Sequence, residues 1–208
     1  PKKVTKIEII TSTDFIHVRN YGVSIPIKKH ETEKGTDGKP IWIPELIFGH
    51  LLTSSNYNDE EQRVTGGRNG YGAKLANVFS SKFHIDISDG NKVYWQDWTD
   101  NMSKVAPPTI ATSADKICPY VSITFYPDWK RFGGPGEFAK LVEKRAWDAA
   151  MWCSKAQVYF NKELLKVPSL EEYAQMHLGD VPIAKMHTEN FDVVVGHSTS
   201  GAFQQCSW

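Results

Sequence analysis

A run of glycines that leads straight into a helical pattern restricts the fold of this chain more than any other feature. Four glycines occur within seven residues, in the stretch Gly66-Gly67-Arg68-Asn69-Gly70-Tyr71-Gly72. Ordering so many glycines costs backbone entropy, so another interaction must offset that cost. From Ala73 onward apolar residues follow a helical spacing, at Leu75, Val78, Phe79 and Phe83. The sequence therefore predicts a glycine-rich loop that is followed at once by a helix.

A junction of this kind favours the binding of an anion. The first N–H groups of a helix have no partner within the helix, and here they would point back into the glycine loop. Arg68 and Lys74 add positive charge on either side. These features suit a triphosphate better than a sugar or an apolar ligand. From composition alone, a tight turn with a charged rim ahead of a surface helix explains the stretch equally well.

Two common nucleotide motifs do not fit the stretch. A P-loop requires G-x-x-x-x-G-K-[ST], but Ala73 follows Gly72 where that motif has its lysine. The dinucleotide motif G-x-G-x-x-G fails because Leu75 stands at the position of its last glycine. By these tests the chain is neither a Walker-type ATPase nor a Rossmann protein.

Composition indicates an ordinary globular chain. The 208 residues include 24 Lys and Arg against 24 Asp and Glu, which argues against a grip on nucleic acid by the whole surface. The three cysteines, Cys118, Cys153 and Cys206, form no CxxC pair, so neither a zinc site nor a disulfide framework is indicated. The simplest compartment is a reducing, intracellular one. No apolar run is long enough to span a membrane.

Alternating and helical patterns elsewhere predict a mixed architecture. Strand patterns cover residues 4–10, 15–18, 83–87, 92–98, 120–126, 156–160 and 191–195. Helical patterns cover residues 137–152 and 170–177, and Pro44 opens a further short helix. The polar residues 28–39 are expected to form a surface loop. The predicted fold class is α+β, a two-layer sandwich with antiparallel strands on one side and helices on the other.

Two long motifs resemble one protein family, in the same order and at the same separation. The stretch from Val64 to Leu75, VTGGRNGYGAKL, is similar to the ATP-lid motif of eukaryotic type II DNA topoisomerases. The stretch from Pro44 to Tyr57, PELIFGHLLTSSNY, resembles the same family. The resemblance implies a Bergerat-type (GHKL) ATP-binding domain over residues 1–166 and the start of a transducer domain over residues 167–208.

The resemblance also implies a set of ATP-binding residues. Asn20 and Gly22 stand where the family has its adenine-side motif, and Ser24 replaces the second glycine of that motif. Ser54, Ser55 and Asn56 match residues that bind ribose and phosphate oxygens. The lid, which encloses the β- and γ-phosphates, is matched by Arg68, Asn69, Gly70, Tyr71 and Gly72, and the family's phosphate-contacting lysine is matched by Lys74. Residues 28–40 are expected to be an insertion without an assigned function.

Other catalytic parts of the family have no counterpart in these 208 residues. The general-base Glu and the Mg²⁺-binding Asn are implied to lie on a helix before Pro1, and the switch lysine beyond Gln205. We therefore expect a segment of a longer enzyme that binds ATP but hydrolyses it poorly alone, since loss of a general base costs about 10²–10⁴-fold in rate.

For the parent enzyme, the resemblance implies ATP and Mg²⁺ as cofactors, double-stranded DNA as partner, a homodimer gated by ATP and a nuclear location. Two alternatives remain at this point. One is a non-enzymatic dimerisation module that responds to nucleotide. The other is a GHKL ATPase of the mismatch-repair or chaperone type.

Overall fold

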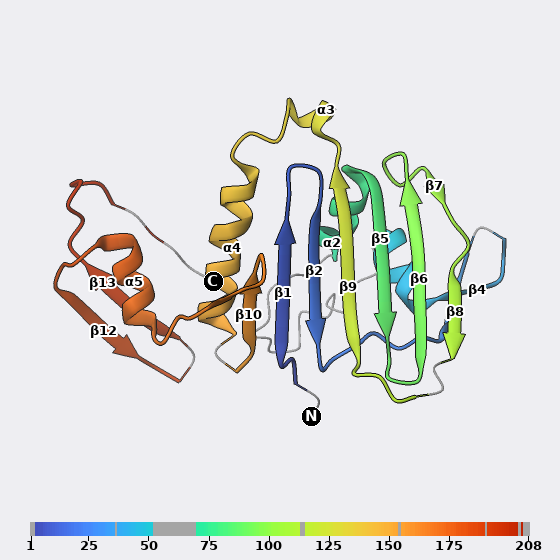
Figure 1. The fold of residues 1–208 in the computed structure, drawn as a ribbon, viewed down its shortest axis with the longest axis horizontal. Coiled ribbons are helices and arrows are strands. Elements are labelled where there is room, and N and C mark those ends of the chain that lie inside the picture. The colour runs from blue at the N-terminus through green and yellow to red at the C-terminus, as the bar shows by residue number, and fades with distance from the viewer. Residues whose placement is uncertain are drawn as a thin grey trace.

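The computed structural model describes residues 3–35, 37–51, 70–112, 115–153, 155–189, 191–203 and residue 205. Most of its strands form one large sheet: β1 (Lys6–Thr11), β2 (Ile16–Tyr21), β5 (Ser80–Ser88), β6 (Lys92–Thr99), β7 (Lys104–Val105), β8 (Thr109–Thr112), β9 (Tyr120–Pro127), β10 (Gln157–Phe160) and β11 (Glu163–Leu165). The strand order is β11-β10-β1-β2-β9-β5-β6-β7, with β8 also paired to β6 (Figure 1). Strands β1 and β10 run parallel, and the other neighbours run antiparallel.

Alternation along the strands divides the sheet into an apolar and a polar face. On β5, Phe83, Ile85 and Ile87 are buried, and they share one core cluster with Tyr94 and Trp98 of β6. The residues between them are polar and only partly buried, as a sheet packed on one face requires. The apolar face is therefore the one on which helices can pack.

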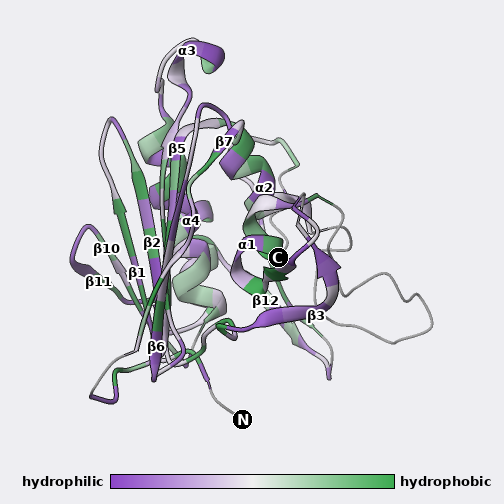
Figure 2. Cartoon of the chain, turned by 90° about the vertical axis from the view of Figure 1, so that its right-hand side faces the viewer, coloured by the Kyte–Doolittle hydropathy of each residue, from purple (hydrophilic) through white to green (hydrophobic). Residues whose placement is uncertain are grey.

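Three helices lie on that side of the sheet: α1 (Ile43–Gly49), α2 (Tyr71–Val78) and α4 (Phe138–Trp152) (Figure 2). Pro44 starts α1, at a position where its missing N–H costs nothing. Helix α4 packs through Ala146 and Ala150 against Ile9 of β1 and Val158 of β10. The short helix α3 (Trp129–Phe132) connects β9 to α4. The two-layer α+β sandwich predicted from the sequence is confirmed.

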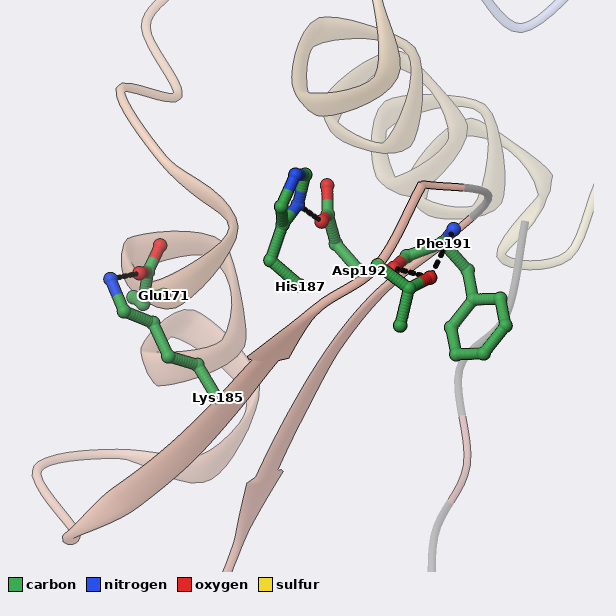
Figure 3. Close-up of polar contacts among 6 residues, drawn as sticks. Glu171, Lys185, His187, Phe191 and Asp192 are labelled. Atoms are coloured by element: carbon green, nitrogen blue, oxygen red, sulfur yellow. Dashed lines mark hydrogen bonds and ion pairs between the residues drawn. The ribbon is translucent and has the colours of Figure 1, made fainter.

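A second, smaller unit follows β11. It consists of α5 (Leu170–Leu178) and the hairpin of β12 (Ile183–His187) and β13 (Asp192–Gly196), and it lies beyond β10 in Figure 1. Figure 3 shows its polar contacts: Lys185 of β12 pairs with Glu171 of α5, and His187 contacts Asp192 across the hairpin. The Phe191 N–H donates to the Thr188 hydroxyl at the turn, with a distance of 2.9 Å.

A buried contact joins this unit to the large sheet. The Tyr173 hydroxyl of α5 donates to the Asp148 carboxylate of α4, and both residues are almost fully buried. The Arg145 guanidinium also donates to Asp148, at 2.9 Å. The proposed boundary after residue 166 falls between the two units in sequence, and it remains a prediction.

Two details of the sequence prediction are wrong. The helix that begins near Ala73 ends at Val78, so Phe83 belongs to β5 and not to the helical face. The polar segment 28–39 is at the surface, but it is not only a loop, because it contains β3 (Lys29–Lys34), which pairs with β4 (Pro40–Trp42). Within the described ranges, each helix is too short or too polar to cross a membrane.

Candidate functional site

The start of α2 has the properties of an anion site. Gly70 precedes the helix with φ 65° and ψ 23°, a left-handed conformation that is unfavourable for a residue with a Cβ. Among the residues that the structure describes, no side chain caps the first N–H groups of α2. These groups and the positive end of the helix dipole are therefore available to a negatively charged ligand.

Lys74 lies one turn into the same helix and is only 2% exposed. Its Nζ donates to the Gly70 carbonyl oxygen at 3.0 Å. Burial lowers the pKa of this ammonium group, because water no longer solvates its charge. Among the described residues, no carboxylate pairs with Lys74. Since an ammonium has three donors, an anion placed here could take up the remaining ones.

Gly72 adds open space beside these donors. It lies within the first turn of α2, with an ordinary backbone conformation and not a positive φ. A Cβ built on Gly72 would meet no atom of the described ranges within 4 Å, outside the backbone of its own helix and its chain neighbours. The chain therefore has a glycine in a helix although nothing in the described protein requires the absence of a side chain.

Asn20 approaches the same region from the sheet. It lies on β2 directly opposite Val121 of β9, so both side chains point to the same face. Val121 packs in the core cluster that also receives Ala73 and Ala76 of α2. Asn20 is thus on the helix-covered face, close to the strand on which α2 packs. Its Nδ2 donates to the Val23 carbonyl oxygen at 3.1 Å, which holds the turn after β2.

That turn explains the glycine of the adenine-side motif. Gly22 has φ 98°, and a Cβ there would lie 2.2 Å from the carbonyl oxygen of Lys3. Only glycine permits this approach of the N-terminal segment. Ser24, at the position of the family's second glycine, is accommodated because its hydroxyl donates to the Tyr120 carbonyl oxygen at 3.2 Å.

The structure describes only part of the residue set implied by the resemblance. It places Gly70, Tyr71, Gly72 and Lys74 together at the start of α2, where Tyr71 is 39% exposed. Asn20 lies on the adjacent face of the sheet. The remaining members lie outside the described residues: Ser54, Ser55, Asn56, Arg68 and Asn69.

Sequence reasoning missed one residue of this region, Asn77. It is fully buried in α2, and its Nδ2 donates to the Phe48 carbonyl oxygen of α1 at 3.0 Å. The available signal was an asparagine inside a predicted helix, a position that its side chain does not favour.

The described residues do not form a metal centre. No group of three or more His, Cys, Asp or Glu side chains in the described ranges could hold a metal ion. The chemistry that this arrangement supports is therefore the binding of an anion by main-chain N–H groups and one buried ammonium.

Comparison with known proteins identifies the family. No family model matches the chain. DNA topoisomerase 2 of Candida glabrata is 44% identical over 79% of this chain, which spans 12% of that relative's length. Two solved structures have the same fold, each covered by this chain over 52% of its length. The ATPase region of Saccharomyces cerevisiae topoisomerase II is 36% identical over 92% of this chain, with a TM-score of 0.82. The ATPase and transducer domains of topoisomerase II from Balamuthia mandrillaris are 36% identical over 97%, with a TM-score of 0.85.

These matches extend over most of the chain, in sequence and in fold. Sequence identity and fold both show that this chain is of the family of eukaryotic type II DNA topoisomerases and corresponds to part of their ATPase region.

Proposed function

We propose that this chain binds ATP between the helix-covered face of the sheet and the start of α2. In this proposal the N–H groups at the start of α2 and the Lys74 ammonium bind the terminal phosphates. Asn20 contacts the adenine side of the nucleotide. The family resemblance assigns Ser54, Ser55, Asn56, Arg68 and Asn69 to the same nucleotide.

The observation that carries this proposal is Gly72. Glycine is less favourable than alanine in a helix, by about 1 kcal/mol in the interior and by less in the first turn, where Gly72 lies. No described residue fills the space next to Gly72, so packing within the described part of the chain does not explain the glycine. Close approach of a ligand to the main chain does explain it. The nearby buried Lys74, which has no carboxylate partner among the described residues, indicates that this ligand is an anion.

For the whole protein we propose ATP-dependent passage of one DNA duplex through another. This part of the proposal is supported by the similarity to DNA topoisomerase 2, of whose length the chain spans about an eighth. The partners would be double-stranded DNA and a second copy of the protein, brought together when ATP binds. We propose the nucleus as its location.

We further propose that Mg²⁺ accompanies the nucleotide without a ligand from the described residues. These residues offer no cluster of three or more acidic, histidine or cysteine side chains for the ion. The resemblance likewise assigns neither the general base nor the switch lysine to residues 1–208. We therefore expect this chain alone to hydrolyse ATP slowly. A phosphate-release assay tests this expectation.

The variant Gly72→Ala tests the proposed site. A methyl group at this position should stabilise the helix by about 0.5–1 kcal/mol while obstructing the approach of phosphate to the main chain. We expect a higher melting temperature and, in calorimetric titration with a non-hydrolysable ATP analogue, weaker binding. Lys140→Ala, an exposed substitution on α4, serves as the control and should change neither quantity. Unchanged affinity in Gly72→Ala would remove the start of α2 from the nucleotide site.

A further inference from the structure

Asn77 connects the two helices that lie on either side of the segment between α1 and α2. Its Nδ2 donates to the carbonyl oxygen of Phe48, in the last turn of α1, at 3.0 Å. Carbonyl groups in the last turn of a helix have no partner within the helix, so this bond satisfies a group that would otherwise be buried and unpaired. Asn77 therefore fixes the end of α1 relative to α2.

The amide oxygen of Asn77 shows that this position is not optimised for stability alone. Asn77 is fully buried, and its Oδ1 has no hydrogen-bond partner in the described part of the chain. An unsatisfied buried acceptor is unfavourable, whereas an apolar side chain of similar size would bury no such group. Asn77 therefore makes its bond to Phe48 although burial of its unpaired Oδ1 lowers the stability of the fold.

The surroundings leave little freedom for the end of α1. A Cβ on Gly49 would lie 3.0 Å from Nε1 of Trp98, another buried polar atom without a partner among the described residues. The backbone of α1 therefore rests directly on the indole ring of β6. Because Trp98 lies against its backbone, α1 cannot move toward the sheet to compensate for a change in its contact with α2.

The other end of α2 is fixed to the sheet by separate contacts. Nδ2 of Asn101 donates to the Val78 carbonyl oxygen at 2.9 Å. Asn101 lies in a run of three residues with positive φ, from Asp100 to Met102, a strained conformation that the surrounding packing must maintain. The Ser80 hydroxyl donates to the Ala76 carbonyl oxygen at 2.6 Å. These contacts fix the C-terminal end of α2. The position of its first turn then depends on contacts along the helix, and the bond from Asn77 to Phe48 is one of them.

We propose that Asn77 is a positioning residue for the nucleotide site. It would act through α2, by holding Gly70 and Lys74 at the distance from α1 that the bound phosphates require, and would not touch the nucleotide itself. This inference rests on the proposed function, in which the first turn of α2 binds phosphate.

The test compares Asn77→Leu with Ser80→Ala. Leucine has a similar branched shape with a larger volume, and it removes both the bond to Phe48 and the unpaired oxygen. Ser80→Ala also removes a buried side-chain bond close to α2, but one that does not reach α1. Affinity for a non-hydrolysable ATP analogue and the melting temperature are measured for both variants, together with the amide NMR resonances of Gly70 and Lys74 in the absence of nucleotide.

We expect Asn77→Leu to melt lower than the unmodified chain, because the buried Phe48 carbonyl loses its partner. At temperatures where the variant is fully folded, it should bind the analogue about tenfold or more weakly, with shifted Gly70 and Lys74 resonances, because small displacements of positioned groups have large effects. Ser80→Ala should retain the affinity within about twofold, as expected for a bond that does not position the first turn. If Asn77→Leu does not fold, Asn77→Ala removes the same bond without the larger side chain and is expected to show the same loss of affinity.

Two outcomes would overturn the inference, and they are distinct. A folded Asn77 variant with the affinity and resonances of the unmodified chain would exclude positioning by Asn77, while Lys74→Met still tests the proposed site. Absence of analogue binding by the unmodified chain would refute the proposed function, and the inference with it.

Discussion

Lys74 is the residue at which stability and the proposed function are most clearly opposed. Its ammonium is buried and has one neutral partner among the described residues, the Gly70 carbonyl oxygen, and burial lowers its pKa below the ordinary value of 10.5. Between the lowered pKa and 10.5 the unfolded chain binds more protons than the folded one. Stability contributed by this site therefore rises with pH in that window, and the charged form is a cost at neutral pH.

The variant Lys74→Met should increase stability and weaken nucleotide binding. The apolar side chain keeps most of the volume without the buried charge, so we expect a higher melting temperature at neutral pH. Affinity for an ATP analogue should fall by about 1–3 kcal/mol, as for the loss of a charge-assisted hydrogen bond. Thermal melting and calorimetric titration of the same sample measure both effects. A variant that is stabilised but binds the analogue as well as the unmodified chain would show that Lys74 does not contact phosphate.

At the scale of the elements, polar contacts on the face of the sheet opposite the helices hold the central strands together. The Tyr21 hydroxyl of β2 donates to the Glu8 carboxylate of β1 at 2.7 Å, and Lys6 pairs with Glu8 at 2.9 Å. The Tyr21 bond, followed by that from Lys6, holds the pKa of Glu8 below its usual value of 4.5. This contribution to stability is present above pH 4.5 and is lost as the pH falls through the lowered pKa.

The variant Tyr21→Phe tests this contact. It should lower the free energy of unfolding at neutral pH by about 0.5–1.5 kcal/mol, the usual net value of such a bond. The difference from the unmodified chain should shrink as the pH falls and Glu8 becomes protonated. Denaturant titrations at several pH values measure it, with Tyr126→Phe on β9 as control. A difference that is independent of pH would show that Glu8 is not the partner that matters.

The elements also show what could be predicted from the sequence. Alternation located most of the central strands, because one face of each is buried against helices. The helix after Gly70 was extended too far, because Phe83 continues the helical spacing while α2 ends at Val78. Its end is set by Asn101, which is distant in sequence and donates to Val78. The hairpin of β3 and β4 was missed because β3 is almost wholly exposed and has no apolar alternation.

The candidate site could be predicted only through its motifs. Composition left an anion site and a simple turn equally open at the glycine stretch. The pattern alone does not distinguish the glycines of this stretch: Gly70 has a positive φ, whereas Gly72 is helical. Asn77 was missed, because its importance depends on a carbonyl group of another helix.

At the scale of the whole molecule, the buried contact between Tyr173 and Asp148 couples the smaller unit to the large sheet. The variant Tyr173→Phe removes the hydroxyl donor, while Lys144 and Arg145 still donate to Asp148. We expect faster amide hydrogen exchange in α5, β12 and β13, and a loss of about 1–3 kcal/mol in stability, as for a bond to a buried charge. Tyr159→Phe, on β10, is the control. Unchanged exchange in α5 would indicate that apolar packing alone holds the two units together.

The central claim is that the start of α2 binds the terminal phosphates of ATP. A crystal structure of this chain with a non-hydrolysable ATP analogue tests it most directly. The account predicts a terminal phosphate oxygen within about 3 Å of Lys74 Nζ and of main-chain N–H groups at the start of α2, the range of such hydrogen bonds. A nucleotide whose phosphates lie elsewhere, with the first turn of α2 uncontacted, would contradict it.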